Sequence, residues 1–248
     1  MIELGAALEV APLVAVGALA GTVNTLAGGG SLLTLPALML LGMPADVANG
    51  TNRVGVLMQA VAASWKLRAQ GGAALRSDPV LALTCCAGAV LGASLSLQVD
   101  EPTLRRIIAA LLLLVLPTLF VRAERWAGHE PAPRALVLGA MFAVGLYGGF
   151  IQAGVGLLLL PLLVLVAGRD AVSANALKTM LVGLFTLPAL VVFVQAGKVA
   201  WGPGLALAAG SAFGGWLGGH LTLRGGPKLV RAALALALVA SAFDLLFR

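Results

Sequence analysis

The chain has 248 residues, of which 60% are hydrophobic and 10% are charged, and its net charge is +6. A soluble domain carries about 25% charged residues because its surface must be solvated, so these proportions exclude a soluble globular protein. Segments that are apolar on every face also exclude the alternating strands of a transmembrane β-barrel. The sequence therefore predicts an all-α polytopic membrane protein that lies in a lipid bilayer and binds no nucleic acid.

Polar interruptions divide the chain into long and short apolar stretches. The long ones, each able to cross about 30 Å of hydrocarbon as a helix, cover residues 5–27, 47–66, 79–99, 104–121, 135–151, 172–195, 202–222 and 229–247. Two shorter stretches, 31–42 and 156–167, each follow a glycine cluster. Helices of that length reach roughly 18 Å, too short to cross the bilayer comfortably. We expect them to be half-helices.

The chain also repeats itself at a constant offset, which places Asn49 on Asn175 and Arg105 on Arg231. Asparagine and arginine are rare in this composition, so their agreement in one register carries more weight than matches between glycines or alanines. A slip of one residue adds the pair Arg53 and Lys178. We predict a duplicated unit, with a first transmembrane repeat in residues 1–122, a polar cytoplasmic linker in 123–133 and a second repeat in 134–248.

The positions of the basic loops favour two inverted repeats, each with four long transmembrane helices and one short half-helix after a glycine-rich break. If both short stretches cross the membrane, the basic loops at 66–76, 122–134 and 224–231 all lie on one side, as the positive-inside rule requires. Both termini then lie outside. If the short stretches dip in and return, the last basic loop falls on the opposite side. The choice between eight and ten crossings stays open.

The first candidate site is the glycine-rich break before the first short stretch. Glycine-rich backbone at membrane depth is costly unless it lines a wet cavity, and a half-helix that follows it aims its N-terminal N–H groups into that cavity, where an anion can bind. The second repeat contains an equivalent break, and two facing half-helix N-termini are typical of transporter sites. The alternative is that the glycines only allow close packing. The expected binding residues are Asn24, Gly28, Gly29, Gly30 and Ser31, with Gln152, Gly154 and Gly156 in the second repeat.

The second candidate site lies just after each half-helix, where a long span begins with amide and cationic residues. It comprises Asn49, Thr51 and Arg53 in the first repeat, and Asn175 and Lys178 in the second. A charge inside a span costs about 3 kcal/mol or more, which by default suggests a function. The alternative is that both cations extend to the membrane interface as ordinary helix-end charges. We expect the two cations and the two helix dipoles to converge on one anion.

Other patterns predict packing. Small residues four apart allow helices to approach closely in lipid, so we expect Gly88, Gly92, Ser96, Gly210, Gly214 and Gly218 to form contacts between the repeats. Cys85 and Cys86 are neighbours in an apolar span and are interpreted as small packing residues. His129 and His220 lack neighbours that would indicate metal binding or catalysis.

The chemistry of enzymes and pumps has no sequence signal in this chain. Acidic residues such as Asp46, Asp78, Asp170 and Asp244 lie near span ends or in loops, so a carboxylate proton relay is not visible. The Gly28 cluster lacks the spacing and the lysine of a P-loop. We expect no enzymatic activity, no catalytic residue, no metal and no cofactor.

Three segments resemble the TauE/SafE sulfite exporter family of membrane permeases. They are residues 21–53 (GTVNTLAGGGSLLTLPALMLLGMPADVANGTNR), 145–178 (GLYGGFIQAGVGLLLLPLLVLVAGRDAVSANALK) and 214–231 (GGWLGGHLTLRGGPKLVR). The resemblance spans essentially the entire chain in its duplicated order. It implies a multi-pass permease of the bacterial inner membrane that carries sulfite, an organosulfonate or a related small organosulfur anion, in a direction that family membership does not fix.

The residues and the resemblance agree on an anion transporter. An inside-negative potential of about 100 mV releases about 2.3 kcal/mol for each negative charge expelled, so the missing carboxylate relay fits export better than concentrative uptake. The hypothesis is alternating access, with the anion between the two half-helix N-termini, Arg53 and Lys178 supplying charge, and the neighbouring amides adding hydrogen bonds. The alternatives are an uptake permease for another small anion coupled to a cation or proton, a divalent-cation carrier and a non-transporting scaffold. Substrate, coupling ion and a homodimer stay open.

Overall fold

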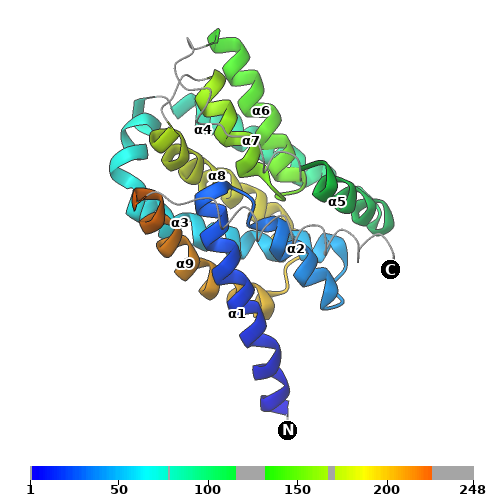
Figure 1. The fold of residues 1–248 in the computed structure, drawn as a ribbon. Coiled ribbons are helices and arrows are strands. Elements are labelled where there is room, and N and C mark those ends of the chain that lie inside the picture. Colours follow the sequence, from blue (N-terminus) through cyan, green and yellow to red (C-terminus); the bar gives the residue numbers. More distant parts are fainter. Residues whose placement is uncertain (1, 78, 116–131, 167–170, 225–248) are drawn as a thin grey trace.

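The computed structural model describes residues 2–77, 79–115, 132–166 and 171–224, which form helices and contain no strand (Figure 1). The helices are α1 (Ile2–Ala27), α2 (Ser31–Leu40), α3 (Ala45–Ser77), α4 (Pro79–Ser96), α5 (Glu101–Val115), α6 (Arg134–Phe150), α7 (Val155–Pro161), a π-helical turn (Leu162–Val166), α8 (Ala171–Gln195) and α9 (Trp201–Arg224). The predicted all-α class is confirmed for this part of the chain.

Each predicted stretch that lies within the described residues is a helix, and both short helices are present. The ten residues of α2 span about 15 Å. The chain after α7 continues as a π-helical turn that begins directly after Pro161; proline lacks the N–H that continues a regular helix. The largest difference is in α3, which continues to Ser77, because alanine, leucine, glutamine and arginine extend a helix beyond its apolar part. The predicted span 229–247 and most of the linker 123–133 lie outside the described residues.

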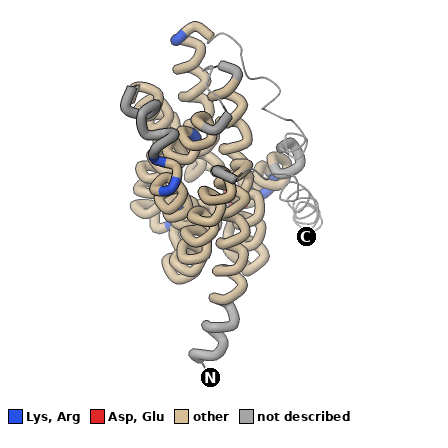
Figure 2. Tube along the Cα trace, turned by 60° about the vertical axis from the view of Figure 1, so that its left-hand side comes forward, with Lys and Arg blue, Asp and Glu red and all other residues tan. Residues whose placement is uncertain are grey.

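The surface of the bundle is suited to a membrane. Large apolar side chains face outward, including Leu83, which is 67% exposed, and Phe213, which is 59% exposed. Figure 2 shows that charged residues are sparse along the described part of the chain. Among the described residues, the stretches long and apolar enough to cross a membrane are Val10–Ala27, Pro79–Ser96 and Ser173–Gln195. Such a surface is solvated by lipid and not by water, so the chain is an integral membrane protein.

The helices exchange partners between the predicted repeats. Helix α1 packs along α9, and α6 packs along α4, while α3 and α8 contact each other in the middle (Figure 1). In the predicted duplication α6 is the equivalent of α1, and α9 is the equivalent of α4. The first helix of each repeat therefore packs on the fourth helix of the other repeat. This arrangement is expected for two copies related by a two-fold axis. The inverted orientation of the two copies in the membrane stays a prediction.

Glycine stripes make these contacts between the repeats close. A Cβ added at Gly92 of α4 would lie 2.7 Å from the backbone nitrogen of Phe150 in α6, and one added at Gly214 of α9 would lie 2.8 Å from that of Thr22 in α1. Real Cβ atoms essentially never approach backbone this closely, so only glycine fits. The prediction that these glycines pack between the repeats is confirmed. The same kind of contact is made by Gly88, Gly145, Gly149 and Gly210.

Replacing Gly149 by leucine should therefore destabilise the protein, whereas the same change at Gly139 of the same helix should not. A Cβ at Gly149 would lie 2.6 Å from the Cα of Ala89, while one at Gly139 has nothing within 4 Å. We expect Gly149→Leu to lower the free energy of unfolding by about 1–3 kcal/mol, the usual cost of overpacking. Unfolding of the purified protein in mixed micelles by added denaturing detergent measures both variants. Equal stability of the two variants would contradict this interpretation of the glycine stripe.

Candidate functional site

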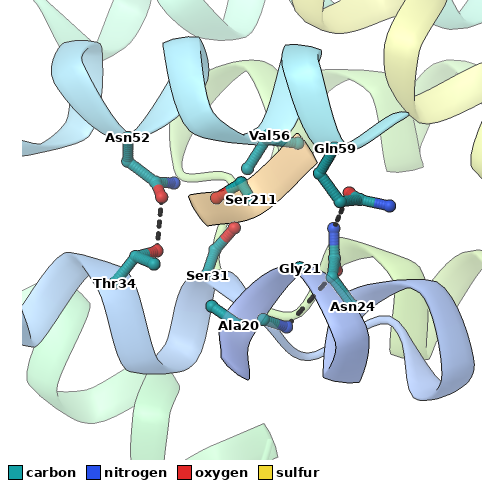
Figure 3. A pocket seen from close by; sticks show the side chains of 10 residues that line it. Ala20, Gly21, Asn24, Ser31, Thr34, Asn52, Val56, Gln59 and Ser211 are labelled. Atoms are coloured by element: carbon teal, nitrogen blue, oxygen red, sulfur yellow. Dashed lines mark hydrogen bonds between the residues drawn. The ribbon is translucent and has the colours of Figure 1, made fainter. Parts of the chain in front are cut away.

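A small polar pocket lies beside the break between α1 and α2, among α1, α2, α3 and α9 (Figure 3). Its empty volume is about 190 Å³. It is narrow, because the space left for the centre of a water molecule is about 10 Å³, which is room for about one water. None of the described residues that line it has a charged side chain. The lining residues are Ala20, Gly21, Asn24, Gly30, Ser31, Thr34, Asn52, Val56, Gln59 and Ser211.

Glycine allows the backbone to break next to this pocket. Gly28 has a φ of +91°, a left-handed conformation that glycine adopts without a steric penalty. The carbonyl of Gly29 accepts the N–H of Leu32 at 3.1 Å, so α2 begins directly after the break. The N–H of Leu33 likewise donates to the carbonyl of Gly30 at 3.0 Å, so what the N-terminus of α2 brings to the pocket is the positive end of its helix dipole. In the second repeat Gly154, with a φ of +68°, precedes α7 in the same way.

Asn24 holds the break in place by hydrogen bonds that replace those lost from the helix. Its Oδ1 accepts the backbone N–H of Gly30 at 3.3 Å, and its Nδ2 donates to Oε1 of Gln59 at 2.6 Å. Gln59 in turn donates from Nε2 to the hydroxyl of Thr25 at 2.7 Å. Figure 3 shows Asn24 and Gln59 reaching toward each other from α1 and α3. The amide dipoles at this end of the pocket are therefore fixed in orientation.

Asn52 offers the pocket a donor that the protein does not use. The hydroxyl of Thr34 donates to Oδ1 of Asn52 (Figure 3). This hydrogen bond fixes the orientation of the amide and leaves its Nδ2 group as a donor. This Nδ2 atom is buried and has no hydrogen-bond partner. Leaving a buried donor unpaired costs about 1–3 kcal/mol. A hydrogen-bond acceptor bound in the pocket would recover that free energy.

The two glycine-rich breaks touch each other at the centre of the molecule. A Cβ added at Gly156 would lie 2.5 Å from the Cα of Gly28, so the two backbones are in direct contact. The sequence predicted that the breaks face each other, and the structure brings them together. In this conformation no space is left between Gly28 and Gly156, and a ligand between the two breaks stays a prediction. The pocket lies to one side, against α2.

Arg53 is fully buried and binds the end of a helix in the other repeat. Its side chain is 0% exposed, its Nη1 donates to the carbonyl of Gly148 at 3.0 Å, and its Nη2 donates to that of Gly149. These carbonyls end α6, where the helix dipole is negative. The guanidinium carbon also lies 4.6 Å from the centre of the Phe193 ring. Arg53 therefore does not extend to the membrane interface, and it does not line the pocket.

Lys178 makes the equivalent contact in the opposite direction. Its side chain is 1% exposed, and Nζ donates to the carbonyls of Asn24 and Thr25 at 3.2 and 3.3 Å. These two carbonyls end α1, directly before the break that borders the pocket. The alternative that Lys178 and Arg53 are interfacial helix-end charges is therefore wrong. Both cations neutralise helix C-termini, and neither contacts the pocket directly.

The paired asparagines support the same carbonyl ends. Nδ2 of Asn49 donates to the carbonyl of Phe150 at 2.7 Å, and Nδ2 of Asn175 donates to that of Thr25 at 3.1 Å. Both contacts cross from one repeat to the other. Each asparagine also contacts a hydroxyl at equivalent positions of the duplication, Ser96 at 3.2 Å and Thr222 at 3.4 Å. Ser96, predicted to be only a packing residue, is therefore part of this hydrogen-bond network.

The remaining predicted residues lie outside the pocket. Thr51 accepts the backbone N–H of Ala200 at 2.9 Å and so fixes the turn before α9. Gln152 donates to the hydroxyl of Thr186, while its Oε1 has no partner and is buried. Of the thirteen residues expected to bind a ligand, the pocket contains three; they are Asn24, Gly30 and Ser31.

The sequence analysis missed four polar lining residues, of which two carried a readable signal. Asn52 and Gln59 stand seven positions apart, which is two turns of α3, so they lie on one face. Uncharged amides in the middle of an apolar span are themselves unusual. The others, Thr34 and Ser211, come from separate helices and give no such pattern. At the offset of the duplication Gln59 corresponds to Phe185, and in the register that pairs Arg53 with Lys178 it corresponds to Leu184, so the second repeat has no amide at this position.

Known proteins are similar to this chain over most of its length. The family model described as Sulfite exporter TauE/SafE matches residues 13–245. The probable membrane transporter protein ORF9 of a Sinorhizobium species is 28% identical over 239 residues, covering 92% of this chain and 88% of the relative. The probable membrane transporter protein YfcA of Escherichia coli K12 is 29% identical over 235 residues, covering 92% and 86%. A probable membrane transporter protein of Haemophilus influenzae is 27% identical, covering 88% and 87%. No solved structure matches the chain.

Substitutions at two glycines with the same backbone conformation should measure how tightly the breaks are packed. Gly28 and Gly42 both have a positive φ, of +91° and +84°, but a Cβ at Gly42 has nothing within 4 Å. Gly42→Ala should therefore lose only the roughly 1–2 kcal/mol of left-handed strain. Gly28→Ala should lose a further 1–3 kcal/mol, about the cost of overpacking, because its Cβ meets Gly156. Detergent-induced unfolding measures both, and equal losses would show that the breaks do not constrain each other.

Proposed function

Because this chain belongs to the TauE/SafE sulfite exporter family, we propose that it is a membrane transporter that moves sulfite or a small organosulfonate anion across the bacterial inner membrane. The observation that carries the proposal is the unpaired Nδ2 donor of Asn52 in a pocket beside the N-terminus of α2. The relatives named as membrane transporters support the transport role. The pocket chemistry supports the anion.

The lining of the pocket favours an oxyanion because its free groups can donate hydrogen bonds. Ser31 and Ser211 contribute hydroxyls, and the N-terminal end of α2 stands beside them. A helix N-terminus carries the equivalent of roughly half a positive charge. A sulfite or sulfonate group presents three oxygen acceptors, which match several convergent donors. A divalent cation would instead need a set of oxygen ligands, and the amide oxygens of Asn24 and Gln59 are already used by the protein.

Buried positive charge behind the breaks adds to this preference. Arg53 and Lys178 lie inside the bundle, and no acidic residue occurs in α1 after Glu9, in α3 after Asp46, or in α4, α6, α7 and α9. Among the described residues these two charges therefore have carbonyls as partners and no carboxylate. In a low-dielectric interior a positive charge acts over longer distances than in water. We assign the cations a role in attracting the anion through space, while the pocket residues make the contacts.

With room for about one water, the pocket in this conformation fits the empty, closed stage of an alternating-access cycle, and it must widen to take up the anion. To reach the pocket and leave it on the other side, an anion needs the Gly28 and Gly156 breaks, which are in contact here, to separate. An inside-negative potential releases about 2.3 kcal/mol per 100 mV for each negative charge that leaves. The proposed direction is therefore export.

Removing the free donor of Asn52 should weaken anion binding. Asn52→Leu keeps the size of the side chain but deletes a hydrogen bond to a charged group, worth about 1.5–3 kcal/mol, so affinity should fall at least about tenfold. The change is measured as the equilibrium affinity of the purified protein for sulfite, thiosulfate and isethionate, with the shift in its thermal unfolding as the readout. Flux of the same anions in proteoliposomes should fall in parallel.

A matched control is Ser94→Ala, which removes an exposed hydroxyl on α4 that bonds only its own helix and should leave binding and flux at the wild-type level. Unchanged affinity in Asn52→Leu would exclude this pocket as the anion site. Stabilisation of the protein by divalent metal cations, with none by the anions, would exclude the proposed substrate class.

A further inference from the structure

Lys178 is a buried ammonium group that has no carboxylate partner among the described residues. It is 1% exposed, and its Nζ has three N–H donors but contacts two acceptors, the carbonyls of Asn24 and Thr25. Carbonyls of a helix C-terminus offer partial negative charge only. Removing an ammonium ion from water costs several kcal/mol even after relaxation. The charged state at this position is therefore one that a bound anion can stabilise.

Within the part of the chain that the structure describes, the elements packed against α8 bring no carboxylate to Lys178. Glu9 precedes Asn24 by about four turns of α1, and Asp46, at the start of α3, forms an ion pair with Lys198 at 2.7 Å. In the described parts of the packed elements, the other titratable or charged side chains are Glu3 of α1, Arg53, Lys66, Arg68 and Arg76 of α3, Cys85 and Cys86 of α4, Arg134 and Tyr147 of α6, and His220 and Arg224 of α9.

The two repeats hold their breaks with different cations. Arg53 supports the end of α6, and a guanidinium keeps its proton under all conditions a protein meets. Lys178 supports the end of α1, and a buried lysine amine can release its proton and become neutral. The releasable proton is therefore on the break that borders the pocket, and the permanent charge is on the break that does not.

Asn24 connects the proton to the ligand. Its backbone carbonyl accepts from Lys178, while its side chain lines the pocket and accepts from Gly30 at the N-terminus of α2. An ammonium group and an anion on two sides of one residue attract each other strongly in a low-dielectric interior. Resting on the proposed function, we propose that Lys178 carries the proton that is transported together with the anion, in the same direction and in the same step.

The proton and charge balance is simple. A proton from the side where the anion enters binds Nζ, the ammonium group holds the carbonyls that end α1, and the anion occupies the pocket. After reorientation both leave to the other side, and the neutral amine, with one donor fewer, lets the empty carrier return without an uncompensated charge at this position. A dianion such as sulfite then leaves with one net negative charge, which an inside-negative potential still expels.

Lys178→Arg tests the proposal because arginine keeps the positive charge but does not release its proton. Thiosulfate and isethionate are the probes in proteoliposomes of the full chain, since sulfite itself exchanges a proton near neutral pH. Wild type should move either anion down its gradient with a parallel pH change in the lumen. Lys178→Arg should exchange labelled for unlabelled anion at about the wild-type rate, yet lose at least about tenfold in net flux and the pH change. Lys198→Arg, the same change at a side chain that is 41% exposed, should behave as wild type in all three.

The outcomes separate this inference from the proposed function. If Lys178→Arg keeps net flux with a wild-type pH change, Lys178 is not the proton site, and the proposed transport function stands. An equal loss of exchange and net flux in this variant would likewise refute the proton site, because it would show a structural role for Lys178. Absence of flux and binding for every anion in wild type overturns both. If Lys178→Arg does not fold, thiosulfate binding to Lys178→Met is measured as a function of pH. The proposal requires that this variant bind thiosulfate more weakly than wild type does in acid, with an affinity that does not change with pH. An affinity that changes with pH as in wild type refutes the proposal.

Discussion

The constraint on which the structure depends is that broken helices inside a membrane protein leave backbone carbonyls that lipid cannot satisfy. Each unsatisfied group costs several kcal/mol in hydrocarbon, and this chain ends α1 and α6 within the bundle. The end of α1 is completed by Lys178 and Asn175, and the end of α6 by Arg53 and Asn49. All four donors come from the opposite repeat, so neither repeat can satisfy its own backbone alone.

This reciprocity links the two repeats mechanically as well as energetically. A movement of one repeat against the other must either carry these hydrogen bonds along or exchange them, so the state of one break depends on the other repeat. The glycine contacts of α4 with α6 and of α9 with α1 make the long interfaces close backbone contacts, with apolar side chains packed around them. The strong polar contacts therefore concentrate at the centre, where Gly28 meets Gly156, and this is the place where a ligand can influence the arrangement.

The sequence predicted what local composition determines. Helix spans, both glycine breaks and the packing stripes follow from apolar runs and small-residue spacing, and the paired Asn49 and Asn175 followed from the duplication. The pocket was predicted only in part, because it arises where α3 and α9 approach α1 in space and because its lining does not recur in the second repeat. Gln59 has an apolar counterpart there, Phe185 or, in the register of Arg53 and Lys178, Leu184. The partners of Arg53 and Lys178 were missed for a related reason, since a buried cation in a sequence does not reveal whether its acceptor is a ligand or a helix end.

The two copies of the predicted duplication share a scaffold and differ in chemistry. Both copies retain an amide and a cation that complete the opposite break, because losing either leaves bare carbonyls at membrane depth. The polar pocket is built on the α1 break, and the corresponding aromatic Phe185 packs near the α6 break at Gly148. The cation that can release its proton is likewise on the α1 break, and the one that cannot is on the α6 break. A structural role in capping the helix alone gives no reason for the lysine to lie beside the pocket. Coupled transport of a proton and an anion gives one, because the two can move together only when the same broken helix holds both.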